Sequence, residues 1–255
     1  SGLDMQLACT HHNVNFSNPA AFKLALTGTV SREQLLPLVC KYLATIPRAQ
    51  LPVPRSLAEV TPLVWSPPAH PVVEDVVVGM VSPICQATLT LPATLERSKA
   101  RKELMWLGLA CQILENRLLA QMRFISGDVY TVNVGSFFGC EAPSSAGNAR
   151  GDVAIGFTCD PPNRQKLFDI ALKEVESLQA GGVTEEELRT VVHLEQLSLA
   201  EGEAENSYWH ELVVSAWQSK SYLQTGCLDE VYKRTTTQRD EVLATALTAE
   251  GPAEI

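Results

Sequence analysis

The chain has 255 residues, of which 45% are hydrophobic and 19% charged, and its formal net charge is −9. A chain of this length can bury a large core, and we expect residues 1–255 to form a single domain. The acidic balance, without a basic cluster, excludes a typical nucleic-acid-binding protein. Because charged residues are fewer than the usual quarter, we expect part of the surface to be buried against a partner.

The seven cysteines are scattered, odd in number and without a C-x-x-C pair. This pattern favours free thiols in a reducing compartment, intracellular or organellar. The uncharged stretch from Val76 to Leu95 contains Pro83 and Pro92, so we do not expect it to span a membrane. The chain begins at Ser1 without a signal-like run, so we expect this start to be a fragment boundary or a processing site, with further protein upstream.

The first fifty residues predict a helix, a strand and a second helix. Met5 to His12 resemble the end of a helix, and the alternation from Phe22 to Gly28 is typical of a strand. Ser31 and Gln34 form a capping box that begins the second helix, which Pro37 is expected to bend. The apolar stripe of this helix comprises Leu35, Leu38, Tyr42 and Ile46.

A proline-rich connection over residues 48–71 leads to strands predicted at Val72 to Val78 and at Cys85 to Leu91. The next segment, Thr94 to Met122, predicts the longest helix. It is apolar on two faces, so we expect it to pack against a sheet on one side and other elements on another. Its two apolar faces are Leu104, Leu107, Cys111, Leu114 and Leu118, and Met105, Trp106, Leu109 and Ile113.

The remaining strands are expected at Val129 to Val134 and Val153 to Phe157, joined by a loop rich in glycine, serine and alanine over residues 135–151. Asp160, followed by a proline, is predicted to cap a helix that ends at the Gly181-Gly182 pair. The buried face of that helix is expected to comprise Leu167, Phe168, Ala171, Val175 and Leu178.

Only helices are predicted after that point. Thr184 and Glu187 form a second capping box, which begins a helix with Leu188, Val191 and Val192 on its buried face. Further helices are expected over residues 206–219, 228–235 and 237–248, and a frayed tail over 249–255. The order of elements predicts an α+β fold, a two-layer sandwich with a mainly antiparallel sheet and helices packed on one face.

The sequence carries no complete metal or phosphate motif. It has neither H-E-x-x-H nor H-x-x-E-H, and the nearest approach, His193 with Glu195, lacks the second histidine. We therefore expect no metal ligand in this chain. A nucleophilic set built from distant residues stays open, although no G-x-S-x-G supports it.

The segment from Leu114 to Tyr130 carries a resemblance to a known family. It resembles the pattern L-x-x-R-L-x-x-x-I-R-E-x-x-G-x-x-Y-S-V of the non-zinc terminal domain of pitrilysin/insulinase metallopeptidases. Arg123, Gly127 and Tyr130 match this pattern, whereas Phe124 stands where the family often has glutamate.

Other stretches match the family in the same order, so that the resemblance covers about residues 5–248. Asn206 to Trp209 is similar to the branch of zinc proteases linked to pyrroloquinoline quinone. The position of Arg123 and Tyr130 favours the last of four similar domains. The other matching stretches are Asn18 to Gly28, Leu36 to Pro47, Phe157 to Asn163 and Gly182 to Leu188.

The resemblance implies a composite peptidase site. A homologous zinc-bearing domain, either covalently linked or a separate subunit, would hold the zinc through H-x-x-E-H. Arg123 and Tyr130 would contact the backbone of a peptide substrate near the scissile bond. On this view the chain has no catalytic residue of its own, binds no metal, and is inactive in isolation.

Alternatives remain at each level. Arg123 would by itself suit the C-terminal end of a helix, and Tyr130 a half-buried strand position. Ser136 to Gly139 would form either a peptide-binding sheet edge or ordinary core and loop. The chain would otherwise be a catalytically inactive scaffold or assembly domain of the same fold, or an unrelated α+β binding domain.

Overall fold

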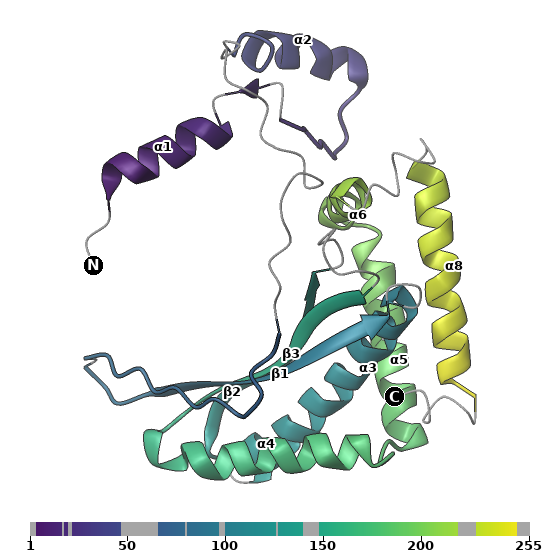
Figure 1. The fold of residues 1–255 in the computed structure, drawn as a ribbon. Coiled ribbons are helices and arrows are strands. Elements are labelled where there is room, and N and C mark those ends of the chain that lie inside the picture. Colours follow the sequence, from purple (N-terminus) through teal and green to yellow (C-terminus); the bar gives the residue numbers. More distant parts are fainter. Residues whose placement is uncertain are drawn as a thin grey trace.

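The computed structural model describes residues 4–16, 18–19, 22–46, 66–79, 81–96, 100–125, 127–139, 148–218 and 228–248. They form an antiparallel sheet with helices against it (Figure 1), which confirms the α+β class. The strands are β1 (Cys85–Glu96), β2 (Val129–Gly139) and β3 (Asn148–Cys159). The helices are α1 (Met5–Phe16), α2 (Arg32–Tyr42), α3 (Ala100–Leu118), η3 (Leu119–Ile125), η4 (Pro161–Asn163), α4 (Arg164–Gln179), α5 (Glu185–Gly202), α6 (Asn206–Gln218) and α8 (Leu228–Ala246).

The sheet has the order β1-β3-β2, so β3 is central and pairs with both neighbours in antiparallel register. Its inner face packs on α3 and α4, which lie beneath it in Figure 1. On the opposite face, Thr88, Thr131 and Asn133 are exposed. The two-layer arrangement with helices on one face is therefore confirmed. Members of this core are Ala87, Leu114, Leu118, Met122, Val129, Val132, Ile155, Phe157, Cys159, Leu167 and Ala171.

Helix α3 is the centre of the fold because it belongs to two cores. Leu114 and Leu118 pack against the sheet, while Leu109 and Ile113 pack against α5 and α8. This confirms the predicted helix with one face on the sheet and another on other elements. The second core comprises Leu109, Ile113, Leu188, Val191, Val192, Val242, Leu243 and Ala246.

The connection between α4 and α5 has the predicted local structure. Gly181 adopts φ +78°, a left-handed conformation that glycine tolerates best, and it ends α4. Thr184 Oγ1 accepts from the Glu187 backbone N–H, and the Glu187 carboxylate accepts from the Thr184 N–H. This capping box is confirmed, as is the one at Ser31.

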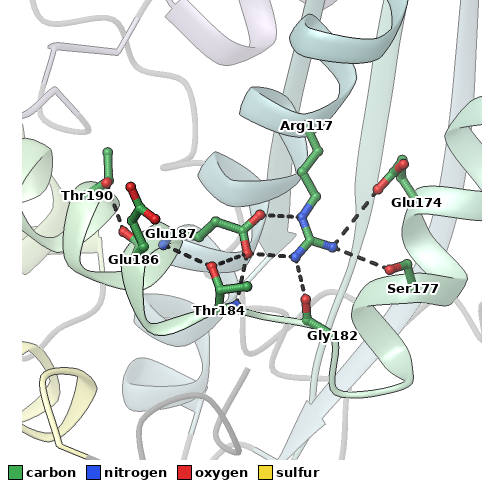
Figure 2. A network of polar contacts seen from close by, with 8 residues as sticks. All are labelled: Arg117, Glu174, Ser177, Gly182, Thr184, Glu186, Glu187 and Thr190. Carbon is green, nitrogen blue, oxygen red and sulfur yellow. Dashed lines mark hydrogen bonds and ion pairs between the residues drawn. The ribbon is translucent and has the colours of Figure 1, made fainter.

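Arg117, in the last turn of α3, joins three segments of the chain (Figure 2). Its Nε donates to Glu187 Oε1 at 2.6 Å, and its Nη2 donates to Glu187 Oε2 at 2.8 Å. Nη2 also donates to the Gly182 carbonyl, while Nη1 reaches Ser177 Oγ at 3.4 Å and Glu174 Oε2 at 3.9 Å. The network therefore fixes α3 against the end of α4 and the start of α5.

Two predicted strands are wrong. Residues 22–28 and 72–78 are coil, and the apolar side chains that alternate along the first of them are exposed. The alternation predicts which side chains share a face, but a strand also needs a partner for its backbone groups. In the described part of the chain, neither segment has one.

Several boundaries also differ from the predictions. Thr94 lies in β1, which runs to Glu96 and tolerates Pro92 because β1 is an edge strand. The long helix therefore begins at Ala100. The two helices predicted at 228–235 and 237–248 are the single helix α8. Strands β2 and β3 extend into the predicted 135–151 loop, while residues 140–147, 47–65 and 249–255 lie outside the described residues.

Helices α1 and α2 lie away from the sheet in Figure 1. Pro37 is inside α2, as expected, but the predicted apolar stripe is not buried. Leu38, Tyr42 and Ile46 are exposed, and only Leu35 is half-buried. The stripe was predicted from spacing, which does not specify what covers it.

Replacing Glu187 with alanine should lower the free energy of unfolding by roughly 2–4 kcal/mol, because Arg117 would keep its half-buried charge without the bidentate partner. Denaturant unfolding measures this loss. Glu185→Ala is the matched control, since Glu185 is also in the first turn of α5 but pairs with Arg189 in solvent. Its effect should stay below about 0.5 kcal/mol, and equal effects of both changes would contradict the assigned role.

The same carboxylate predicts acid sensitivity. Its hydrogen bonds to Arg117 lower the pKa of Glu187 to about 2, from an ordinary value of 4.5. The pair therefore stabilises the folded state fully above about pH 4.5, and this stabilisation is lost as the pH falls toward about 2. Between these limits, denaturation midpoints should fall more steeply for the native chain than for Glu187→Gln. If the midpoints of the native chain and of Glu187→Gln fell in parallel with pH, the lowered pKa of Glu187 would be contradicted.

Candidate functional site

Arg123 lies at the surface, directly after the fully buried Met122. The α-helical turns of α3 pass at Leu119 into the π-helical turn η3, which ends at Ile125. Leu118 and Met122 both have no exposed surface, whereas Arg123 is exposed. Burial of Met122 thus fixes the backbone that carries Arg123. A π-helical turn is rare and occurs often at functional sites.

The turn after η3 returns the chain to the sheet. The Asp128 N–H donates to the Met122 carbonyl at 3.0 Å, and Gly127 adopts φ +67°. A side chain at this left-handed position would be strained, so glycine is the suitable residue there. Phe124, which stands in place of the family's glutamate, has a side chain outside the described ones.

A β-bulge places Tyr130 on the outside of the sheet. Val129 pairs with Cys159 and Thr131 with Thr158, so Tyr130 is the extra residue of β2. Val129 and Val132 are both buried, although strict alternation would put them on opposite faces. The bulge resolves this conflict and leaves Tyr130 58% exposed.

The Tyr130 hydroxyl donates to Asp160 Oδ1 at 3.1 Å. This hydrogen bond, and then the charge of Asp160, raises the pKa of Tyr130 and holds the phenol in its protonated form. Asp160 was predicted to cap the next helix with its side chain. It does precede the 3₁₀ turn η4, but its carboxylate makes no capping bond there and accepts from Tyr130 instead.

Asp128 connects the same turn to the start of α4. Its Oδ1 accepts from Asn163 Nδ2 at 3.1 Å, and its Oδ2 forms an ion pair with Lys166. The turn between η3 and β2 is therefore held from inside by Met122 and from the side by Asp128. Arg123 and Tyr130 are exposed on either side of it.

Both predicted side chains, Arg123 and Tyr130, thus lie at the surface. They do not form a hydrogen bond with each other. In the described part of the chain, the Arg123 guanidinium has no hydrogen-bond or ion-pair partner. The π-helical turn, the bulge and the Asp160 contact were not predicted. The odd spacing of Val129 and Val132 is the one sequence signal that would have indicated the bulge.

Metal ligands do not gather in the described ranges, where no group of three or more His, Cys, Asp and Glu could hold an ion. His193 is exposed on α5, and Glu195 accepts from Gln112 Nε2 at 3.0 Å. Among the described helices, none is long and apolar enough to cross a membrane.

Residues 10–194 match the model of the peptidase M16 inactive domain. The chain belongs to this family. A relative from Arabidopsis thaliana, described as a zinc protease PQQL-like, is 30% identical over 221 residues, which is 86% of this chain. The chain spans only 23% of that relative's length.

Two solved structures are also similar. The periplasmic protease PqqL of Escherichia coli has a TM-score of 0.47 and 19% identity, over 88% of this chain and 22% of that one. The ferredoxin protease FusC, solved in complex with Arabidopsis ferredoxin, has a TM-score of 0.49 and 16% identity, over 98% of this chain and 28% of that one. Because both TM-scores are below 0.5, family membership rests on the family model and the Arabidopsis sequence.

Asp160→Asn should lower the pKa of Tyr130 toward its ordinary value, because the amide removes the negative charge and the ionic acceptor. NMR titration of ¹³C-labelled tyrosine, assigned with Tyr130→Phe, measures the change. Asp169→Asn is the control, because that carboxylate lies on α4 and accepts from Gln165. An unchanged pKa in Asp160→Asn would show that the 3.1 Å contact does not persist in solution.

Proposed function

We propose that this chain is the zinc-free half of a zinc endopeptidase site, in which Arg123 and Tyr130 bind the backbone of a peptide substrate. The zinc would be held by a homologous domain with the H-x-x-E-H motif, on the same polypeptide or another. The observation that carries the proposal is the exposure of both donors on either side of the Gly127 turn, in a chain of the M16 inactive-domain family.

The two side chains suit this role chemically. A guanidinium is a permanent donor, and a phenol both donates and accepts. Donors aimed at a carbonyl or its tetrahedral oxyanion stabilise the charge that develops there. Zinc on the partner domain would supply the activated water.

Asp160 gives Tyr130 a defined resting state. The proton that the phenol would donate to a substrate carbonyl is the one now donated to Asp160. While that bond lasts, the phenol oxygen can accept a substrate N–H instead. Because the contact is exposed, exchanging Asp160 for substrate costs little. Until that exchange, the raised pKa of Tyr130 keeps the phenol protonated.

The second candidate is a scaffold domain of the same fold that serves assembly without catalysis. The replacement of the family's glutamate by Phe124 favours it, because that position follows the arginine directly. The two candidates differ in one respect only: whether the complete protein hydrolyses peptides through these two side chains.

Arg123→Ala and Tyr130→Phe should each lower kcat for a fluorogenic peptide by roughly 10²–10³ in the complete zinc-bearing protein, if each side chain stabilises the transition state. Circular dichroism should be unchanged, because both side chains are exposed. Arg189→Ala and Tyr42→Phe are matched controls at exposed positions on α5 and α2.

Native turnover in both site variants would overturn the proposed role of the pair. Absence of turnover in the zinc-loaded native protein, across a set of peptides, would favour the scaffold candidate. The controls separate a local effect at the turn from a general loss of stability.

A further inference from the structure

Two cysteines face each other at one end of the sheet. Cys85, the first residue of β1, is the register partner of Cys159, the last residue of β3. Both are free thiols that pack on the core beneath the sheet. Because opposed residues of an antiparallel pair point to the same face, both side chains lie on the core side of the sheet.

The register alone brings this pair within reach of a disulfide. Residues directly opposite in an antiparallel pair have Cα atoms about 4.5 or 5.5 Å apart, according to the type of pair. Disulfides accept Cα separations of about 4.4–6.8 Å. Opposed side chains also point to the same face, so the bond needs no reversal of either side chain.

The other described cysteines lack this arrangement. Cys9 and Cys40 are exposed on α1 and α2, and Cys111 is buried on α3. In the described strands, Cys85 and Cys159 are therefore the one opposed pair.

We propose that Cys85 and Cys159 are a dithiol modification site that a low-molecular-weight disulfide, such as glutathione disulfide, converts reversibly into a cross-strand disulfide. The site needs no contribution from the proposed peptidase function. The site is nevertheless next to the candidate peptidase site, because Asp160, which accepts from Tyr130, directly follows Cys159.

The reaction has two thiol–disulfide exchanges. Cys85 is half-buried and Cys159 fully buried, so the Cys85 thiolate attacks glutathione disulfide first and releases one glutathione thiolate. Cys159 then loses its proton and attacks the Cys85 sulfur, which releases the second glutathione. Two protein thiols are oxidised to one disulfide, and glutathione disulfide is reduced to two thiols that take up both protons.

The environment of Cys159 sets the slow step. Burial, followed by the neighbouring Cys85, raises the pKa of Cys159 to about 11, so its thiol is protonated at neutral pH. The mixed disulfide on Cys85 should therefore form first and be resolved more slowly.

The test treats the folded native chain with glutathione disulfide, alkylates the remaining thiols, and maps the peptides by mass spectrometry. We expect a Cys85 peptide linked to a Cys159 peptide, released by dithiothreitol, and a Tm higher by on the order of 5 °C. Cys159→Ser should instead accumulate glutathione on Cys85, and Cys85→Ser should form no link. Cys111→Ser, which removes a buried but unopposed thiol, should link as the native chain does.

Two results would overturn the proposal: a native chain that holds glutathione on Cys85 without resolving it, and a link that forms only in denaturant. If Cys159→Ser does not fold, the test uses Cys85→Ser, which should disturb the core less because the Cys85 thiol is only half-buried. A Tm rise in oxidised Cys85→Ser equal to that of the native chain would also contradict the assignment.

Discussion

The pairing of Arg117 with Glu187 is the constraint on which the helical layer depends. A cation in the last turn of α3 meets the carboxylate that also completes the capping box of α5, and the Gly182 carbonyl between α4 and α5 (Figure 2). With its side chain only 15% exposed, this guanidinium needs several acceptors. One residue therefore sets how three helices meet beneath the sheet.

Helix α3 also positions the candidate site, because each exposed side chain of that site lies beside a buried one. Helix α3, fixed at Arg117, continues into η3, where burial of Met122 leaves Arg123 in solvent. On the other side of the turn, burial of Val129 and Val132 requires the bulge that turns Tyr130 outward. The interior thus determines where both polar side chains stand, although neither belongs to it.

Features whose interacting residues lie close together in the sequence could be predicted, and features that depend on distant residues could not. Both capping boxes and the two-faced helix were correct, because their partners lie within a few residues or repeat along one element. The strands at 22–28 and 72–78 failed because pairing depends on distant backbone. The Asp160 contact was missed for the same reason, because its partner Tyr130 is 30 residues away in the sequence. The π-helical turn was missed because it departs from the regular helical period.

The strand end at Phe157 to Pro161 shows why a short motif can carry both structure and chemistry. Phe157 and Cys159 face the core, and between them Thr158 accepts on the outer face from Thr131 Oγ1 at 3.2 Å. Asp160 then leaves the strand, and Pro161 begins η4. The Asp160 carboxylate does not cap this turn and accepts from the Tyr130 hydroxyl instead. The core thus fixes the geometry of β3 up to Cys159, and the residue after it, Asp160, raises the pKa of the Tyr130 phenol. One short strand end therefore contributes to the packing of the sheet and to the electrostatics of the candidate site.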